Sequence, residues 1–407
     1  MQNKENIVIL GAGFGGIQTA LWLLKKFKKN EFKKYNILLI DKNDYHLFTP
    51  LLYEVATVFD EKLNEKIKNV CVLKLNEIFK EYINKNQITI LKKTVLEINH
   101  QNQEITLEGN QKINYQHIFL SLGAETNFPP NIIQTNVLTL KTLDSAFEIR
   151  KTLMSALQTK DKIKIIIVGA GPNGLELASQ IKIQTNFYFP SKKVNILIIN
   201  GSDKILSSFD EKIIRLANQR LKALNVEILN NEIIQKIENK KVITTHQTIN
   251  CDIVIWTGGF KANQITQKLE LPKNQQGRLI VNNFLKTDGI YALGDLATIE
   301  KEGKTLTPFS AHNAILGGKI AALNFLSEMR KSNKKINYQL SEYSYIIPLG
   351  GKYTLAKIWK FKMKGFLAWI LKGVVELNYF LKIFPLWKAL VLWIRGLIIF
   401  TFNKNLG

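Results

Sequence analysis

Two glycine-rich segments, whose first glycines lie 158 residues apart, constrain the fold of this 407-residue chain more than any other feature. In the first, an apolar run at 7–10 leads directly into the glycine-rich stretch 11–16, and a helix-like stretch follows. Residues 164–168 lead into 169–174 in the same way. A second apolar run then ends at a polar residue, 30 positions after the first glycine in one segment and 31 in the other. The pattern predicts two βαβ units in tandem, with the glycines where strand becomes helix.

Glycine-rich turns are common, so the chemistry of such a turn depends on its context. The first glycine of a G-x-G-x-x-G turn makes the tight bend, the second lets the backbone approach a pyrophosphate, and the third packs helix against strand. The N-terminus of the helix adds partial positive charge. Two copies in the correct context predict an α/β fold with two Rossmann-like dinucleotide-binding domains. The residues expected to hold the dinucleotides are Gly11, Gly13, Phe14, Gly15, Gly16 and Asp41 in the first unit, and Gly169, Gly171, Pro172, Asn173, Gly174 and Asn200 in the second.

The two units differ in the polar residue that ends the second strand. Asp41 would accept hydrogen bonds from a ribose, whereas Asn200 stands where an NAD-binding unit usually has Asp or Glu. Asparagine can bond a ribose hydroxyl, but it lacks the charge that repels the 2′-phosphate of NADPH. We therefore expect NADH at the second unit, with NADPH as the alternative.

Two stretches outside the glycine turns have the texture of antiparallel hairpins. Residues 88–113 and 222–252 alternate apolar and polar side chains. Each stretch is followed by an apolar strand that runs into glycine, first at Gly123-Ala124 and later at Gly258-Gly259. We therefore expect hairpin strands in both stretches and a buried strand after each.

The charge of the chain indicates an anionic partner. Fifty-six Lys and Arg residues against thirty-three Asp and Glu residues give a net charge of +23. Such an excess suits nucleic acid or an anionic membrane surface. From Gly351 onward there are ten basic residues, one acid (Glu376) and four of the six tryptophans. Basic side chains among Trp and Phe are typical of a membrane interface rather than a nucleic-acid groove.

The C-terminal segment is expected to lie on a membrane rather than to cross it. Its longest charge-free run is the eight residues 396–403, whereas a spanning helix needs about 20 apolar residues. At about 100° per residue, a helix over 359–384 has Trp and Phe on one face and most lysines, including Lys372, on the other. A second helix is expected from Leu386 to about Phe400. We predict that 355–403 anchors the chain to an anionic lipid surface; a packing or dimer helix is the alternative.

The N-terminus and the cysteines exclude other classes of protein. No secretory apolar region opens the chain, because the run at 7–10 ends in glycines. We therefore expect a peripheral protein on the cytoplasmic face of the cell membrane. Two cysteines, Cys71 and Cys251, and five scattered histidines predict neither a disulfide framework nor a metal site. Both cysteines are expected to be small buried apolar side chains.

The chain resembles a known family in five segments. They are 41–57 (DKNDYHLFTPLLYEVAT), 141–146 (KTLDSA), 169–176 (GAGPNGLE), Gly294-Asp295 and 365–369 (GFLAW). They are similar to those of the two-dinucleotide-fold flavoprotein reductases of the pyridine nucleotide-disulphide oxidoreductase superfamily, and more closely of type II NADH:quinone oxidoreductases. The resemblance implies a non-covalent FAD in the first fold, NADH in the second and a quinone as acceptor, without proton pumping.

The resemblance also implies domains and site residues. We expect an FAD-binding domain at 1–125 and 259–345, an NAD(P)H-binding domain at 126–258 and a membrane-association domain at 346–407. Glu176 would lie near the nicotinamide as a catalytic residue; otherwise it is a carboxylate favoured by a helix N-terminus. The remaining expected residues are Lys42, His46, Gly123, Ala124, Gly294 and Asp295 for FAD, Gly258 and Gly259 for NADH, and Phe48, Pro50, Leu51, Ala311, His312 and Lys382 for the quinone.

Departures from the family pattern leave two alternatives open. The glutamine-rich stretch that often lies at the quinone end of the flavin is replaced by 308–318, where His312 stands in place of the first glutamine. No cysteine pair follows Asp41, which argues against a disulfide reductase. The alternatives are a quinone reductase with another donor, such as sulfide, and a non-respiratory NAD(P)H-binding flavoprotein with a basic binding surface. A homodimer and the identity of the quinone stay open.

Overall fold

The computed structural model describes residues 4–130, 132, 137–238, 240–301, 304–305, 307–338 and 344–400. Residues 401–403, the end of the predicted lipid-binding segment, lie outside this part. The chain forms two compact units. Unit 1 comprises Met1–Leu47, Val72–Glu125 and Phe260–Leu340, and unit 2 comprises Phe48–Cys71, Thr126–Gly259 and Ser341–Gly407. The segment Phe48–Cys71, which the sequence analysis placed in the first domain, thus groups with unit 2.

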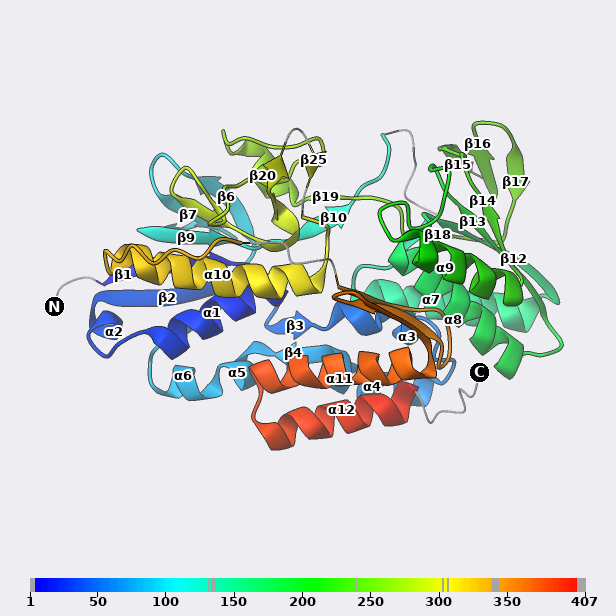
Figure 1. The fold of residues 1–407 in the computed structure, drawn as a ribbon, viewed down its shortest axis with the longest axis horizontal. Helices are drawn as coiled ribbons and strands as arrows, with labels where there is room; N and C mark the ends of the chain where they lie inside the picture. The colour runs from blue at the N-terminus through cyan, green and yellow to red at the C-terminus, as the bar shows by residue number, and fades with distance from the viewer. Residues whose placement is uncertain are drawn as a thin grey trace. The chain divides into compact units, whose positions relative to one another are not determined.

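Unit 1 is built on a six-stranded sheet with a buried central strand. The strand order is β21-β22-β9-β1-β2-β5, parallel except for β21. Two helices, α1 (Phe14–Lys26) and α10 (Ala311–Met329), lie side by side (Figure 1). The strands are β1 (Glu5–Leu10), β2 (Tyr35–Asp41), β5 (Thr89–Lys92), β9 (His117–Leu120), β21 (Lys286–Thr287) and β22 (Ile290–Ala292).

Glycine sets the close approach of α1 and α10. A Cβ on Gly318 would lie 2.3 Å from the carbonyl oxygen of Gly15. The hydroxyl of Thr19 also donates to the carbonyl of Gly318, at 3.4 Å. Helices α1 and α10 therefore pack closely together near the end of α1 that begins in the glycine turn.

Unit 2 contains a five-stranded parallel sheet in the order β11-β18-β12-β13-β14. Its central residues, Ile165, Ile166 and Ile167, are fully buried, as expected of a parallel sheet covered on both faces. The strands are β11 (Leu138–Thr139), β12 (Lys162–Val168), β13 (Lys193–Ile199), β14 (Val226–Leu229) and β18 (Ile253–Trp256), and the helices are α7 (Leu143–Thr159), α8 (Pro172–Tyr188) and α9 (Glu211–Ala223).

Both predicted βαβ units are present, and the first hairpin region is confirmed only in part, because β5 joins the parallel sheet of unit 1. β6 (Val95–Asn99), β7 (Glu104–Leu107) and β8 (Gln111–Asn114) form an antiparallel sheet. The second region is only partly a hairpin. β15 (Ile234–Glu238), β16 (Lys241–Thr244) and β17 (Thr248–Asn250) are antiparallel, but β14 joins the parallel sheet because it directly follows α9.

The C-terminal segment differs from its prediction at its start. The expected helix from Trp359 is wrong, because β27 (Thr354–Ile358) and β28 (Phe361–Gly365) form a hairpin there. Gly365, at φ +75°, ends the hairpin, and α11 (Phe366–Ile383) and α12 (Leu386–Phe400) follow as a packed pair (Figure 1). Within the described part of the chain, no helix combines the length and the apolar character needed to cross a membrane.

The remaining elements of unit 2 lie in the segment 48–71 and before β27. They are the short helices η1 (Thr49–Leu51), α3 (Leu52–Val55), η2 (Glu61–Leu63) and α4 (Asn64–Cys71), and the strand β26 (Tyr345–Pro348). The strand β26 pairs with β27, and α4 packs on α12. Unit 1 also contains β3 (Tyr45–Leu47), which pairs with β4 (Val72–Lys74).

Candidate dinucleotide and electron-transfer site

The first glycine turn is crowded around its first and last glycines and open at its middle glycine. Gly11 has φ +98°, and a Cβ there would lie 2.5 Å from the carbonyl oxygen of Ser121. A Cβ on Gly16 would lie 1.8 Å from the carbonyl oxygen of Gly11. A Cβ on Gly13, in contrast, would meet no atom of the described residues within 4 Å, apart from its chain neighbours. The turn is therefore closed behind and open where a ligand would approach.

The second glycine turn repeats this geometry. Gly169 has φ +102°, and its Cβ would lie 2.6 Å from Cα of Gly258. A Cβ on Gly174 would lie 2.0 Å from the carbonyl oxygen of Gly169, whereas one on Gly171 meets nothing described within 4 Å outside its neighbours. Gly13 and Gly171 are the N-caps of α1 and α8, and neither helix start receives a capping hydrogen bond from a described side chain. Each helix thus presents backbone N–H groups toward open space, as an anion site requires.

The polar residues that end β2 and β13 bond in opposite ways. The carboxylate of Asp41 accepts the N–H groups of Ala12, at 2.7 Å, and Asn43, at 2.8 Å. Burial raises the pKa of Asp41, and these two bonds oppose the rise. Asn200 instead donates from Nδ2 toward the carbonyls of Ser202 and Lys204, both at 3.1 Å, and toward Asn230 Oδ1 at 2.9 Å.

Aromatic side chains support the first turn. His46, on β3, is buried, and its Nδ1 lies 3.1 Å from the carbonyl oxygen of Ala12. Burial lowers the pKa of His46 to about 4, so the imidazole is neutral at physiological pH. The ring of Phe14 meets His46 edge-on at 4.7 Å between centroids. The structure therefore brings Phe14, His46 and the glycine turn together, while Lys42 lies exposed beside them.

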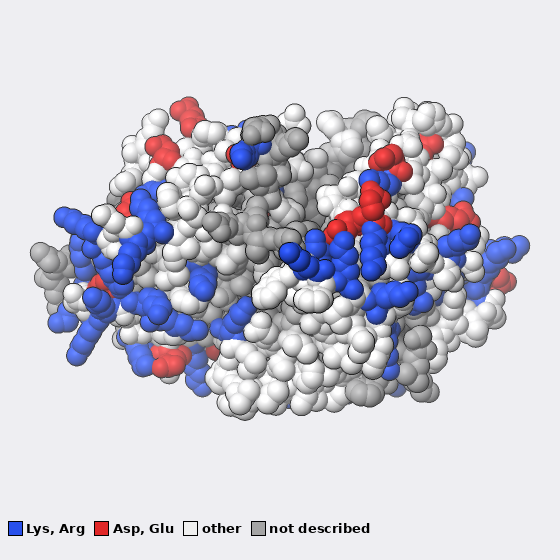
Figure 2. Space-filling view, in the orientation of Figure 1, with Lys and Arg blue, Asp and Glu red and all other residues white. Residues whose placement is uncertain are grey.

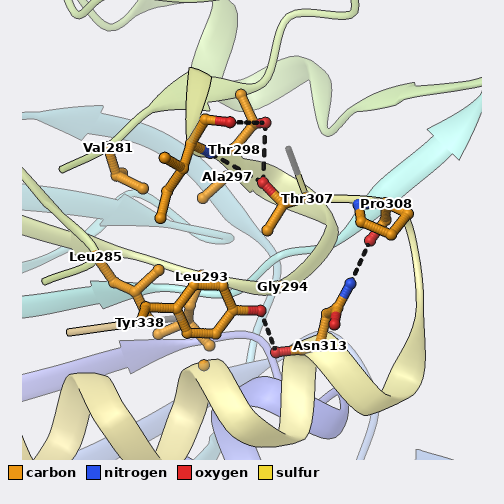
Figure 3. A pocket seen from close by; sticks show the side chains of 12 residues that line it. Val281, Leu285, Leu293, Gly294, Ala297, Thr298, Thr307, Pro308, Asn313 and Tyr338 are labelled. Carbon is orange, nitrogen blue, oxygen red and sulfur yellow. Dashed lines mark hydrogen bonds between the residues drawn. The ribbon is translucent and has the colours of Figure 1, made fainter. Parts of the chain in front are cut away.

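Gly294 and Asp295 begin the short helix η5 (Gly294–Leu296) at the edge of a small cavity in unit 1. Figure 3 shows the phenol of Tyr338 bonded to the carbonyl of Asn313 (3.2 Å), and the amide of Asn313 bonded to the carbonyl of Pro308 (2.9 Å). These bonds fix the start of α10. Of the predicted quinone residues nearby, Ala311 is half-buried and His312 is exposed.

Sequence reasoning missed Arg278, which is almost completely buried in unit 1. Its guanidinium donates to the carbonyls of Thr307 and Ala297 and lies 4.4 Å from the ring centroid of Phe309. Burial lowers its pKa to about 10. Arg278 therefore clamps the segment that leads to α10, and a lone arginine before a strand carried no signal for this role.

A buried group of charged side chains in unit 2 was also missed. Nζ of Lys372 on α11 lies 3.0 Å from Glu54 Oε1 on α3 and 2.8 Å from Glu376 Oε1 one turn along α11. Burial raises the pKa of Glu176, the fifth residue of α8, to about 8; Lys372 opposes the rise and Glu54 adds to it. Lys372 had been predicted on a solvent-facing side of the tail helix, which is wrong because it pairs with two carboxylates in the interior.

The predicted quinone residues of unit 2 divide between interior and surface. Phe48 is buried and stacks on Tyr379 at 5.4 Å between centroids, and Leu51 is buried as well. Pro50 and Lys382 are exposed. Phe380 on α11 is one of the apolar residues predicted to face lipid. Its ring packs against that of Phe48 instead, at 5.0 Å between centroids.

The C-terminal segment carries a broad exposed apolar face. Figure 2 shows a surface almost free of charged side chains where α11 and α12 lie. Two tryptophans of this segment are highly exposed: Trp359 is 70% exposed and Trp387 is 69% exposed. We define the apolar face as Trp359, Phe361, Phe366, Leu367, Ile370, Val374, Val375, Leu381, Leu386, Trp387, Val391, Ile394 and Ile398. Such a face exceeds what single scattered surface residues provide and indicates an interaction site.

Comparison with known proteins gives consistent matches. Residues 5–336 match the model of the family described as pyridine nucleotide-disulphide oxidoreductase. The type II NADH:quinone oxidoreductase Ndh of Mycobacterium tuberculosis is 24% identical over 410 residues, covering 92% of this chain and 84% of the relative. The demethylphylloquinone reductase NdbB of Synechocystis is 28% identical over 325 residues, covering 76% of each chain.

Solved structures show the same fold. The structure of NDH2 from Plasmodium falciparum in complex with NADH aligns with a TM-score of 0.81 at 19% identity, over 99% of both chains. The sulfide:quinone oxidoreductase of Aquifex aeolicus aligns with a TM-score of 0.78 at 18% identity, over 99% of this chain and 96% of that one. At these identities the likeness establishes the architecture, and the assignment of substrates depends on the residues.

Proposed function

The chain belongs to the pyridine nucleotide-disulphide oxidoreductase family, and from that premise we propose that it is a type II NADH:quinone oxidoreductase. It would take a hydride from NADH through a non-covalently bound FAD and pass two electrons to a quinone, without pumping protons. The observation that carries the proposal is the pair of open, uncapped glycine turns at Gly13 and Gly171. One turn suits the pyrophosphate of FAD and the other that of NADH.

The residues of unit 1 fit a flavin dinucleotide. Such a cofactor, when bound, accepts a hydride and passes electrons onward. The N–H groups at the start of α1 would hold the pyrophosphate, and Asp41 would hold the ribose. Neutral His46 would support the turn from behind through Ala12. Gly294 and Asp295, which match the late motif of the resemblance, would contact the diphosphate and ribityl groups.

The residues of unit 2 would bind and orient NADH. The start of α8 would hold its pyrophosphate, and Asn200 its ribose. With Nδ2 engaged by the following loop, the carboxamide oxygen of Asn200 is the atom available as an acceptor for a ribose hydroxyl. Glu176 is the fifth residue of the same helix and would lie near the nicotinamide, protonated below a pH of about 8.

A sulfide donor is disfavoured by the cysteines, although the fold is shared with a sulfide:quinone oxidoreductase. Cys71 and Cys251 are both buried and unbridged in the described structure. Burial raises the pKa of both thiols, that of Cys251 to about 11. A thiol is reactive mainly as its thiolate, so neither residue suits the chemistry of sulfide oxidation.

An assay of the purified chain tests the proposed function. We expect a yellow protein that releases about one FAD per chain on denaturation and oxidises NADH with a water-soluble quinone. NADPH should be the poorer donor. A colourless protein that cannot be reconstituted with FAD would exclude the proposal, and oxidation of sulfide without NADH would favour the second candidate.

We also propose that the apolar face lies in the surface of an anionic membrane on the cytoplasmic side. Exposed Trp and Phe side chains suit the interface, and the exposed lysines at its border, Lys360, Lys364 and Lys382, would contact lipid headgroups. Point substitutions are the suitable test, since α11 also buries side chains in unit 2 and its deletion would expose them.

The membrane proposal predicts a graded loss of binding. Changing Lys360 and Lys364 to Glu should weaken binding to anionic vesicles by about 1 kcal/mol per lysine neutralised, with a further repulsive contribution. Co-sedimentation with anionic and neutral vesicles measures this. Lys241→Glu, on the exposed hairpin strand β16, is the matched control and should have no effect. A wild-type chain that stays off all vesicles and elutes as a dimer would instead make the apolar face a contact between copies.

A further inference from the structure

Three ionisable side chains from two helices meet inside unit 2, and a fourth, on a third helix, interacts with them electrostatically. We define the acid cluster as Glu54 on α3, Glu176 on α8, and Lys372 and Glu376 on α11. Lys372 Nζ lies 3.0 Å from Glu54 and 2.8 Å from Glu376, and the exposed fractions of these three side chains are 11–15%. The phenol of Tyr53 donates to Glu54 Oε1 at 2.6 Å. The three acids lie far apart in the sequence, and only the fold brings them together.

The charges of the acid cluster do not balance when all its groups are ionised. Three carboxylates would face one ammonium group, and the other titratable groups that contribute, Tyr53 on α3 and Cys71 on α4, add no positive charge. From α12 the side chain that approaches Gly373 is Trp393, which is not titratable. Two uncompensated negative charges in a poorly hydrated site are unfavourable, so the cluster retains protons at neutral pH.

Hydrogen bonding does not relieve the excess of carboxylates in the acid cluster. Glu54 Oε2 is buried and receives no hydrogen bond from any described residue. The cluster therefore contains fewer donors than its carboxylate oxygens could accept. Burial also raises the pKa of Glu376, against the effect of Lys372. For Lys372 burial alone would lower the pKa, but Glu376 and Glu54 more than offset this, so the lysine stays charged.

The proposed reaction requires a proton that NADH does not supply. In the balanced equation, NADH, one proton and a quinone give NAD⁺ and a quinol. The hydride brings two electrons and one proton, and the second proton comes from water. A reduced quinone in an apolar site therefore needs a protein group that holds this proton and is refilled from solvent.

We propose that the acid cluster stores this proton and donates it to the quinone, an inference that rests on the proposed function. Helix α11 links the cluster to the candidate quinone residues, because Tyr379 and Phe380 follow Glu376 by three and four positions and both pack against Phe48. The cluster loses one proton to the reduced quinone and regains one from water through its partly exposed edge. Glu54 and Lys372 act as positioning residues, because Lys372 pairs with both Glu54 and Glu376.

A purely structural role is the competing explanation. A buried ion pair between α3 and α11 would hold the tail in place, and its loss would destabilise unit 2. Such a loss would lower every activity of the enzyme together. A proton store, in contrast, affects only reactions that consume a proton.

The test compares Glu376→Gln with Glu65→Gln, a control on α4 whose carboxylate is exposed and pairs with Lys68. Each full-length variant is assayed with NADH and either a water-soluble quinone or ferricyanide, which accepts electrons without protons. We expect Glu376→Gln to reduce the quinone about tenfold more slowly than wild type while ferricyanide reduction stays within about twofold. Glu65→Gln should match wild type, and Glu376→Asp, which keeps an acid, should restore most of the quinone rate.

The pH profile gives an independent readout. Wild-type quinone reduction should fall as the pH rises through about 8, where Glu176 loses its proton, and Glu376→Gln should show a lower and flatter profile. Equal losses with both acceptors, or no loss with the quinone, would overturn the proposal. If the Glu376→Gln protein does not fold, the same comparison of quinone and ferricyanide reduction is made with Glu54→Gln. A wild-type chain inactive with every quinone would instead refute the proposed function.

Discussion

The two glycine turns are alike in backbone and different in the side chains around them. In both, the first glycine has φ near +100°, the last glycine contacts the carbonyl of the first, and the middle glycine faces open space. The strand ends differ, since Asp41 accepts two backbone N–H groups and Asn200 donates to its own loop. The backbone therefore defines a pyrophosphate site in each unit, and the side chains decide which dinucleotide each would take.

A hydroxyl supports each turn. That of Ser121 donates to the carbonyls of Leu10 and Gly11, both at 2.9 Å, and that of Thr257 donates to the carbonyls of Val168 and Gly169 at 2.8 and 3.3 Å. The difference is that the first turn is backed in addition by a buried neutral histidine bonded to Ala12. A hydroxyl does not titrate near neutral pH, whereas an imidazole does. The first turn should therefore respond to acid and the second should not.

The largest expected effect is at Gly13. In Gly13→Val, the side chain would occupy the open space and block a pyrophosphate without striking the described surroundings. We expect a folded but colourless protein with no NADH oxidation, measured by absorbance in the visible range and by circular dichroism. Gly16→Ala is the contrast, because its Cβ would strike the carbonyl of Gly11 and should impair folding itself. A yellow Gly13→Val protein would contradict the assignment of this turn.

Gly171→Val tests the second turn in the same way and should have a different outcome. The protein should stay yellow, because the blocked space lies in unit 2, but NADH should reduce the flavin poorly. We expect the KM for NADH to rise by about tenfold or more, as the loss of a pyrophosphate site costs well over 1 kcal/mol. Steady-state kinetics and flavin content measure the two effects separately. Loss of colour in this variant would reverse the assignment of the two units.

The glycine turns were predictable because their information is local. Strand, turn and helix adjoin within about 30 residues, and a positive φ or a close backbone approach demands glycine regardless of the rest of the chain. Glu176 was identified only by resemblance, since nothing in its neighbourhood marks it. The acid cluster was not predictable, because α3, α8 and α11 come from distant parts of the sequence.

The wrong prediction of a helix from Trp359 has a physical cause that lies partly outside the tail. Residues 360–364 alternate lysine with Phe and Met, which is the period of a strand, but they lie among apolar residues that also fit a helix. The hairpin is preferred because β28 completes a sheet with β27, and Lys357 and Lys362 both pair with Asp210, at 3.1 and 2.6 Å. These bonds lower the pKa of Asp210 to about 2. Such distant ion pairs are invisible to periodicity.

Because the titratable side chain of His46 supports the first turn, we expect the flavin site to be sensitive to acid. The folded-state pKa of His46 is depressed to about 4, below its usual 6.5, so its contribution to stability is complete above 6.5 and is lost as the pH falls through about 4. We expect the protein to begin releasing flavin as the pH falls from 6.5 towards 4. Flavin fluorescence measures this release. His46→Gln, which keeps a donor toward Ala12, should bind flavin with a flatter acid profile. An unchanged profile in this variant would assign the release to other groups.

The smallest expected effect concerns the strand-end residue of the second unit. Asn200→Glu would place a negative charge near the ribose and repel the 2′-phosphate of NADPH, by about 1 kcal/mol or more, which is about fivefold in the ratio of kcat/KM for NADH over NADPH. The variant also loses the donor that bonds Ser202, Lys204 and Asn230, so it should be less stable by about 1 to 2 kcal/mol in urea unfolding. Asp41→Asn is the reciprocal change and should weaken FAD retention without altering the NADH to NADPH ratio. If Asn200→Glu is less stable but its ratio of kcat/KM for NADH over NADPH is unchanged, Asn200 organises the loop and does not select the nucleotide. The two units would then share a common backbone but bind the ribose in unrelated ways.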